Sequence, residues 1–381
     1  MVEPGSTDPG GATGHRWTQA QATCAGCGCV CDDIEVTADG LVRTCPLGDR
    51  WFAERSGDRP PIARIDGREV SLDEAAGAAA AILREARAPL VYGLGQTSCE
   101  AQRRAVALAE AAGAVIDVGA TVDAYAAIGS STATFGEIRD RAELVVVWRA
   151  DPVVTHPRLL ERLRLDPSAM VVVDAERTAT ADAAGAFVQV DDDFEALWAL
   201  RAQIREEAHD GLAGRMLAAR HVAFIHGALD ELTALALLSL VRDLASDRHA
   251  VALGLRGDGN ARGAEDVLAW QTGFAAPVGF ARGFPRESPG AAELLERGEV
   301  DAALVVAADL PRLRELPTVV IDARATATLE AARVAFATAA DGIEIAGTAH
   351  RMDGVPVPLR APLTTDRPGV EDVLAAIAER L

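Results

Sequence analysis

Short apolar runs alternate with longer stretches of helical periodicity over most of this chain. Runs rich in Val, Ile and Leu, with no polar residue at every second position, predict strands that are buried on both faces. Such strands, separated by helices, are typical of mainly parallel sheets, so the pattern predicts an α/β fold. We expect strands at residues 90–93, 115–118, 144–148, 170–174, 187–190, 222–225, 250–253, 303–306 and 318–322.

The intervening helices are predicted from Ala-rich and amphipathic stretches whose ends carry recognisable signals. Ser71 is a good N-cap, and Gly113 follows the last turn of a helix that begins at Cys99. Three carboxylates at 191–193 suit the N-terminal end of a helix dipole. We expect helices at residues 72–87, 99–112, 157–165, 194–208, 229–245 and 370–381.

The same pattern divides the chain into segments. A Gly-, Thr- and Pro-rich beginning predicts a flexible tail, and a Pro-Pro pair after Arg59 marks a linker. The expected division is a tail at 1–20, a cysteine-rich subdomain at 21–58, α/β domains at 59–215 and 216–345, and a C-terminal segment at 346–381 that returns to the first domain. Parallel sheets bind ligands at the carboxyl ends of their strands, so a site is expected in the loops after Tyr92, Val118, Trp148 and Asp174.

Composition removes several classes of function. The 381 residues are 49% hydrophobic and 25% charged, as in an ordinary soluble globular protein, and the net charge of −20 disfavours nucleic-acid binding. All basic side chains apart from histidine are Arg, which excludes a P-loop lysine and pyridoxal chemistry. No apolar run reaches the length of a membrane span, and the first residues do not resemble a signal peptide, so we expect cytoplasmic residence.

Five of the six cysteines lie within 22 residues, between Cys24 and Cys45. Cys24 and Cys27 have C-x2-C spacing, Cys31 follows closely, and a hairpin around 39–40 would carry Cys45 back towards them. Four thiolates at this spacing suit an iron–sulfur cluster or a tetrahedral zinc ion, whereas Cys29 is one thiol too many. The alternative is a group of buried, unpaired thiols; disulfides are disfavoured in a reducing compartment.

Other candidate sites are weaker. Residues 93–98 could present backbone amides to a phosphate but lack the third glycine of a dinucleotide fingerprint, and the loop 254–263 is a similar case. Cys99 begins a helix whose dipole would lower its pKa, yet packing is the simpler role because no histidine partner is evident. His156 is interpreted as a helix cap rather than a catalyst.

The ordered motifs resemble the B-type subunit of formylmethanofuran dehydrogenase. The resemblance covers nearly the whole chain after residue 20, and its motifs are specific as a set. They are Cys24-x2-Cys27-x3-Cys31-Asp-Asp-Ile, Cys45-Pro-Leu-Gly, Thr97-Ser-Cys-Glu-Ala, His156-Pro-Arg, Trp270-Gln-Thr-Gly, Arg282-Gly-Phe-Pro-Arg and Gly347-Thr-Ala-His-Arg-Met-Asp.

This resemblance implies a molybdopterin-oxidoreductase-like fold with one iron–sulfur cluster and a tungsten or molybdenum pterin. In the archaeal family the metal is held by a cysteine or selenocysteine in a Val-Cys-His-Gly-Pro-type loop after a strand. Asp123 stands at that place here, and the following His-Gly-Pro is absent. The later Gly-Cys-Asn-Pro-like segment is here Arg149-Ala-Asp-Pro. A hard carboxylate has replaced a soft thiolate, so no tungsto- or molybdopterin is expected.

With this departure from the archaeal pattern, the chain resembles the corresponding subunit of the bacterial formyltransferase/hydrolase complex of one-carbon metabolism. There a formyl group passes from tetrahydromethanopterin to a furan carrier and is hydrolysed to formate without electron transfer. The resemblance implies a non-catalytic structural subunit, with an amidohydrolase-like A-type subunit, a C-type subunit, plus a formyltransferase D-type subunit as partners. Cys24, Cys27, Cys31 and Cys45 would hold an iron–sulfur cluster, a zinc ion or no metal. The alternatives are an active pterin-dependent dehydrogenase subunit, and an electron-transfer or metal-binding protein that uses the cysteines alone.

Overall fold

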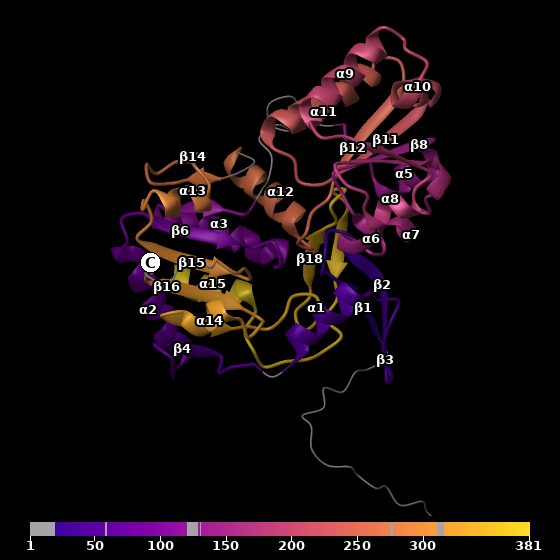
Figure 1. Ribbon diagram of the computed structural model, residues 1–381. Coiled ribbons are helices and arrows are strands. Elements are labelled where there is room, and N and C mark those ends of the chain that lie inside the picture. Colours follow the sequence, from indigo (N-terminus) through magenta and orange to yellow (C-terminus); the bar gives the residue numbers. More distant parts are fainter. Residues whose placement is uncertain (1–19, 58, 120–128, 130, 275–276, 311–315) are drawn as a thin grey trace, which may run out of the picture.

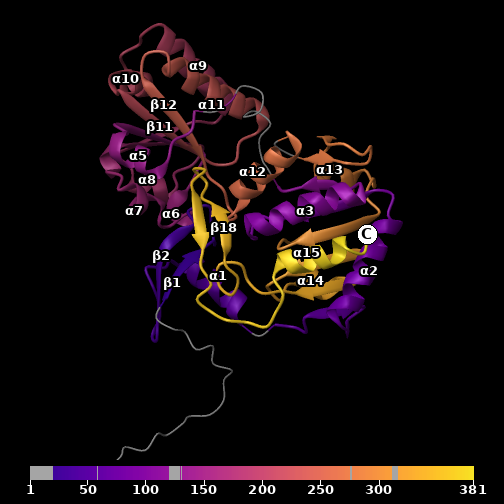
Figure 2. The same cartoon turned by 180° about the vertical axis from the view of Figure 1, so that it is seen from behind.

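The computed structural model describes residues 20–57, 59–119, 129, 131–274, 277–310 and 316–381. Two α/β units are visible, one around each large group of strands, and the cysteine-rich segment lies close to both (Figure 1). Helices α2, α3 and α15 lie with the first group of strands, and α9, α10 and α11 with the second (Figure 2). No described helix combines the length and apolarity that a membrane crossing requires.

The large sheet has the strand order β14-β13-β7-β6-β15-β16-β17-β4-β5. Its centre is parallel, because β6 pairs with β7 and β15, and β15 continues through β16 to β17. The outer strands are antiparallel. The strands are β4 (Ala63–Ile65), β5 (Arg68–Glu69), β6 (Pro89–Gly93), β7 (Val115–Asp117), β13 (Val278–Gly279), β14 (Arg286–Glu287), β15 (Ala302–Val306), β16 (Thr318–Asp322) and β17 (Val334–Ala337).

Helices bury both faces of the large sheet. Side chains from one helix group form a continuous apolar cluster on one face, and a smaller cluster covers the other. The first group is α2 (Leu72–Glu85), α3 (Cys99–Ala112), α12 (Ala261–Thr272) and α15 (Val370–Ala378), and the second is α13 (Ala291–Glu296) and α14 (Ala327–Ala331). Burial on both faces explains why the central strands show no polar alternation.

The small sheet is parallel throughout, with the order β10-β9-β8-β11-β12. The strands are β8 (Leu144–Trp148), β9 (Met170–Asp174), β10 (Ala186–Gln189), β11 (His221–His226) and β12 (His249–Gly254). Its helices are α5 (Phe135–Arg141), α6 (Pro152–Thr155), α7 (Leu159–Leu163), the 3-10 turn η1 (Pro167–Ala169), α8 (Ala179–Ala183), α9 (Asp193–Arg205), α10 (Gly211–Ala218) and α11 (Glu231–Leu244).

The cysteine-rich segment forms a separate antiparallel sheet of β1 (Ala20–Cys24), β2 (Cys31–Thr37) and β3 (Gly40–Val42), followed by α1 (Pro46–Ser56). It contacts a hairpin of β18 (Gly347–His350) and β19 (Pro356–Leu359), where Thr23 Oγ1 donates to the carbonyl of Pro358 at 2.8 Å. The first and last parts of the described chain therefore lie together.

The predicted α/β fold with mainly parallel sheets is confirmed. Strands 144–148, 170–174 and 318–322 and helix 99–112 have the predicted bounds, and Gly113 ends its helix in the left-handed region with φ of 65°. Sheet pairing, however, crosses the expected boundary between residues 215 and 216, because β11 pairs with β8 as well as with β12. Similarly β15 pairs with β6, far away in the sequence.

Candidate metal centre

Two of the candidate ligands face each other across an antiparallel strand pair. Cys24 ends β1, Cys31 begins β2, and the two are direct partners in the register. The turn between them is closed by a hydrogen bond from the Val30 amide to the Cys27 carbonyl at 3.1 Å. Val30 has a positive φ of 38°, an unfavourable conformation for a β-branched residue, so the surroundings must hold this turn in shape.

Other parts of the fold supply that support. The Gly28 amide donates to the Arg256 carbonyl after β12, and its carbonyl accepts from the Met352 amide, both at 2.9 Å. A Cβ at Gly28 would lie 2.7 Å from the Arg256 oxygen, so only glycine permits this approach. The turn is thus connected to the small-sheet unit and to the C-terminal segment.

Cys45 approaches through the start of α1. It is the N-cap residue of this helix, and its carbonyl accepts from the Asp49 amide at 2.8 Å. Gly48, in the first turn, lies beside the Cys24 sulfur, which would be 3.2 Å from a Cβ added there. The Gly26 amide also donates to this sulfur at 3.4 Å. Cys24 is therefore the thiol around which the segment packs.

The protonation of the thiols differs from one to the next. Burial raises the pKa of Cys24 well above its usual range, and neighbouring Cys31, Cys27 and Cys45 raise it further. Burial raises the pKa of Cys31 to about 12, against the opposing effect of nearby arginines. A hydrogen bond from Cys29 lowers the pKa of Cys27 to about 7. Cys29, expected to be surplus, thus pairs with a candidate ligand.

Arginines provide positive charge beside the thiols. Arg158 makes a bidentate pair with Asp33 at 2.7 and 2.8 Å, and Arg162 contacts Asp32 at 3.1 Å. Both guanidinium groups lower the pKa of Cys31, and the Arg158 hydrogen bonds lower that of Asp33. These ion pairs join β2 to α7.

The donor chemistry suits a soft metal, since Cys24, Cys27, Cys31 and Cys45 all offer sulfur atoms as ligands. The sulfur positions do not form a closed ligand set: within the described ranges, no group of three or more His, Cys, Asp or Glu side chains is arranged to hold a metal ion. None of the six cysteines forms a disulfide.

The other candidate residues from the sequence have roles in packing or in capping helices. Burial raises the pKa of Cys99 to about 11, which outweighs the expected lowering by the helix dipole, so this thiol is a packing residue. His156 is the C-cap of α6, as predicted, and its ring contacts the Arg256 carbonyl at 2.8 Å and Thr155 Oγ1 at 2.9 Å. Asp192 caps α9 by accepting from the Glu195 amide at 2.9 Å, as the carboxylate run predicts.

Asp123, on which the interpretation of the pterin loop depends, lies outside the described residues. The second altered segment, 149–152, is described. Arg149 pairs with Asp193 at 2.8 Å and Asp174 at 3.2 Å, and Asp151 accepts from the amide and hydroxyl of Thr180 at 2.9 and 2.5 Å. These polar side chains are engaged within the small-sheet unit.

A cavity of about 640 Å³ lies beside the cysteines at the carboxyl ends of β6 and β15. Its lining includes Tyr92 and Gln96 after β6, as expected for a parallel sheet, together with Arg55 of α1. Arg55 was not singled out by the sequence. Its position at i+4 from Trp51 on an otherwise apolar helix face was the available signal.

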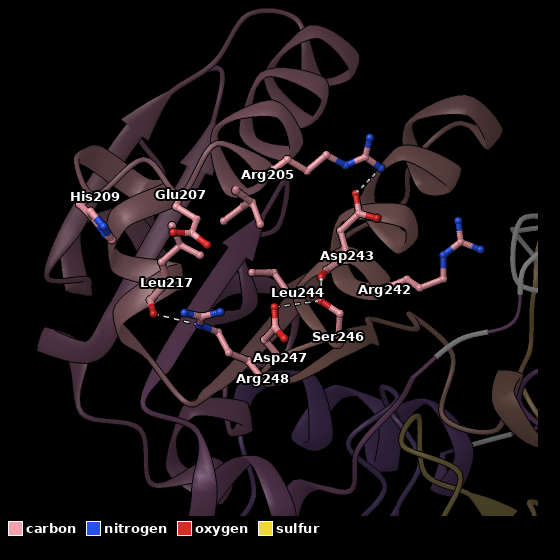
Figure 3. Close-up of a pocket in the computed structure, with 11 residues that line it drawn as sticks. Arg205, Glu207, His209, Leu217, Arg242, Asp243, Leu244, Ser246, Asp247 and Arg248 are labelled. Carbon is pink, nitrogen blue, oxygen red and sulfur yellow. Dashed lines mark hydrogen bonds and ion pairs between the residues drawn. The ribbon is translucent and has the colours of Figure 1, made fainter.

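A second cavity, of about 490 Å³, lies among α9, α10 and α11, away from the cysteines (Figure 3). Three of its charged residues have partners within the lining: Arg205 contacts Asp243 at 3.4 Å, and Arg248 donates to the Leu217 carbonyl at 2.9 Å. Its lining contains no residue that the sequence predicted as a ligand.

The chain is similar over its length to curated proteins. It is 31% identical to the B-type subunit of tungsten-containing formylmethanofuran dehydrogenase 2 from Methanocaldococcus jannaschii, over 88% of this chain and 92% of that protein. It is 30% identical to the B-type subunit of the formyltransferase/hydrolase complex of Methylorubrum extorquens, over 64% of this chain and 74% of the relative. No family model matches the chain.

A solved structure supports the same relationship. The crystal structure of the formyltransferase/hydrolase complex from Methylorubrum extorquens, in complex with methylofuran, contains a chain that superposes with a TM-score of 0.70 at 25% identity. The match covers 84% of the present chain and 98% of the chain in the complex.

Proposed function

This chain belongs to the family that contains the B-type subunit of formylmethanofuran dehydrogenase together with its counterpart in the formyltransferase/hydrolase complex, and on that basis we propose that it is a non-catalytic structural subunit of such a complex. The complex would pass a formyl group from tetrahydromethanopterin to a furan carrier and release formate in cytoplasmic one-carbon oxidation. Its partners would be an amidohydrolase-like A-type subunit, a C-type subunit and a formyltransferase D-type subunit.

One observation carries this proposal: Asp123 stands where the resemblance expects the thiolate that holds tungsten or molybdenum, and the residues after it have changed as well. A carboxylate is a hard ligand and a poor substitute for thiolate on a soft, redox-active centre. The second altered segment supports it, because Arg149 and Asp151 bond side chains of their own unit.

We further propose that Cys24, Cys27, Cys31 and Cys45 hold a structural iron–sulfur cluster or zinc ion. Bound metal would favour the thiolate forms, whose pKa is otherwise raised by burial at Cys24 and Cys31. It would also connect β1, β2 and α1 and so stabilise the segment that contacts both α/β units. In the absence of an electron acceptor next to it, this centre would have no redox task.

The purified complex tests the proposal by its reactions. We expect formyl transfer and formate release, with no dye-linked oxidation of a formylated furan amine. Dye reduction at a rate comparable with formate release would contradict the structural role.

The second candidate is an active pterin-dependent dehydrogenase subunit, and a specific observation favours it. The relative from Methanocaldococcus jannaschii, described as tungsten-containing, aligns with 88% of this chain, against 64% for the relative from the formyltransferase/hydrolase complex. Dye-linked oxidation in the intact complex would select this candidate.

A further inference from the structure

The cavity beside the cysteines contains a buried cation, Arg55, whose side-chain hydrogen bonds go to neutral acceptors. Arg55 is only 5% exposed, and its guanidinium donates to the Trp51 carbonyl at 3.2 Å and to Gln96 Oε1 at 3.3 Å. Both acceptors are neutral. Among the described residues, the nearest carboxylate oxygen is Oε2 of Glu54 at 3.8 Å, on a side chain that is 46% exposed.

Burying a charge without a hydrogen-bonded counterion is costly, and the pKa of Arg55 reflects this cost. Burial, followed by repulsion from Arg324, lowers the pKa of Arg55 to about 10 against the attraction of Asp322 and Glu54, so the group stays charged at neutral pH. Arg324 differs, because its guanidinium pairs with Asp322 at 2.8 Å. An anion in the cavity would compensate Arg55 and relieve its repulsion from Arg324.

The cavity wall is built to hold the guanidinium in place. Gln96 accepts from Trp51 Nε1 at 2.9 Å and donates to Asp258 Oδ1 at 2.8 Å, which fixes the amide oxygen towards Arg55. The guanidinium lies 4.9 Å from the centre of the Trp51 ring. Gly95 has no side chain, and a Cβ there would lie 2.8 Å from an oxygen of Asp258. Arg55 is therefore preorganised to face a ligand.

The charges of the lining select the kind of anion. The described lining carries three cations, Arg50, Arg55 and Arg324, and three carboxylates, Glu54, Asp258 and Asp309. These charges cancel, so the lining has no net positive charge to attract a dianion. A singly charged planar group suits the two-pronged guanidinium. We propose that this cavity binds a small monocarboxylate anion, with the buried guanidinium of Arg55 as its cationic anchor.

The identity of the natural ligand rests on the proposed function, under which the complex releases formate. The charge argument does not depend on that function. If the protein binds formate and also contains stoichiometric pterin, the proposed function is wrong and this site stands. If it contains no pterin and does not bind formate, only this site is wrong.

The test is a titration of the full-length chain with 13C-labelled formate, followed by NMR line broadening at constant ionic strength. We expect saturable binding, and we expect Arg55→Met to weaken it about tenfold or more because the charge-assisted hydrogen bonds are lost. Arg55→Gln, which keeps a polar side chain, is a second variant in case Arg55→Met does not fold. The control is Arg104→Met, an arginine of α3 that lies outside the cavity lining and whose side chain is 57% exposed; its affinity should change less than about threefold.

Three results would overturn the proposal. They are the absence of saturable formate binding to the wild-type chain, equal affinity in the Arg55 variants, and a loss in Arg104→Met as large as that in Arg55→Met. Parallel titrations with phosphate and sulfate test the ligand class. Tighter binding of either dianion than of formate would contradict a monocarboxylate site.

Discussion

At the scale of single residues, the N-terminal segment depends on where five thiols lie. Cys24 and Cys31 are partners across a strand pair, Cys45 is the N-cap residue of α1, and Cys29 lowers the pKa of Cys27 through a hydrogen bond. The spacing predicted that the first four would gather, but not that the fifth would pair with one of them, because sequence spacing does not reveal side-chain direction in a tight turn.

The metal proposal predicts a selective loss on substitution. Cys31→Ser should remove zinc or iron from the purified protein and expose β1 and β2 to hydrogen exchange, because a ligand to the metal that stabilises the segment is lost. The matched control is Cys99→Ser, a buried thiol next to Asn260, which should leave metal content unchanged. Equal metal content in wild type and Cys31→Ser would contradict the assignment.

A buried ion pair gives a second prediction at this scale. Arg59 donates to both oxygens of Glu344 at 2.8 and 2.7 Å, and the two side chains are 5% and 1% exposed. Arg59→Met leaves an unpaired buried carboxylate, so the free energy of unfolding in urea should fall by about 3–5 kcal/mol. Arg104→Met, in the exposed pair with Glu371, should change it by about 1 kcal/mol or less. Similar effects of the two variants would show that burial does not govern this pair.

At the scale of secondary-structure elements, the sequence predicted most strands and helices and some of their caps. Apolar runs locate buried strands well, and Ser71 caps α2 as predicted by accepting from the Glu74 amide at 3.1 Å. Long-range caps were not predictable. The amide of Ser98, at the start of α3, donates at 2.7 Å to Asp341, which is 243 positions away.

The burial of Asp341, which outweighs the opposing effect of this hydrogen bond on its pKa, makes the stability of the fold depend on pH. Burial raises the pKa of Asp341 to about 6, above the usual unfolded value, so the native state binds the proton more tightly. The stabilisation is complete below about pH 4 and is lost as pH rises through about 6, a difference of about 3 kcal/mol. Between pH 7.5 and pH 4, the free energy of unfolding in urea should rise by about this amount more for the wild type than for Asp341→Asn. A pH-independent difference between the two proteins would contradict this account.

At the scale of the whole molecule, sheet membership differs from chain order. β8 to β12 form the small sheet, whereas the large sheet combines β4 to β7, which precede them in the sequence, with β13 to β17, which follow them. The strand–helix pattern is the same in both units, so the sequence cannot show that one unit is inserted into the other. The position of Arg55 beside the cavity also depends on this assembly, which explains why the sequence did not single it out.

We propose that the cooperative units follow the sheets rather than the boundary at 215/216. Native-state hydrogen exchange should then show β11 and β12 opening with β8 and β9, and β15 and β16 opening with β6. Amides of β11 that open together with those of β15 would instead support a second domain of contiguous sequence.

The central claim is that this chain retains the fold of a pterin enzyme subunit without its redox centre. Elemental analysis of the purified complex, combined with its optical spectrum, tests this claim most directly. We predict no stoichiometric tungsten or molybdenum and no pterin, with iron or zinc as the metal at the cysteines. One tungsten or molybdenum per chain, with a pterin, would contradict the claim.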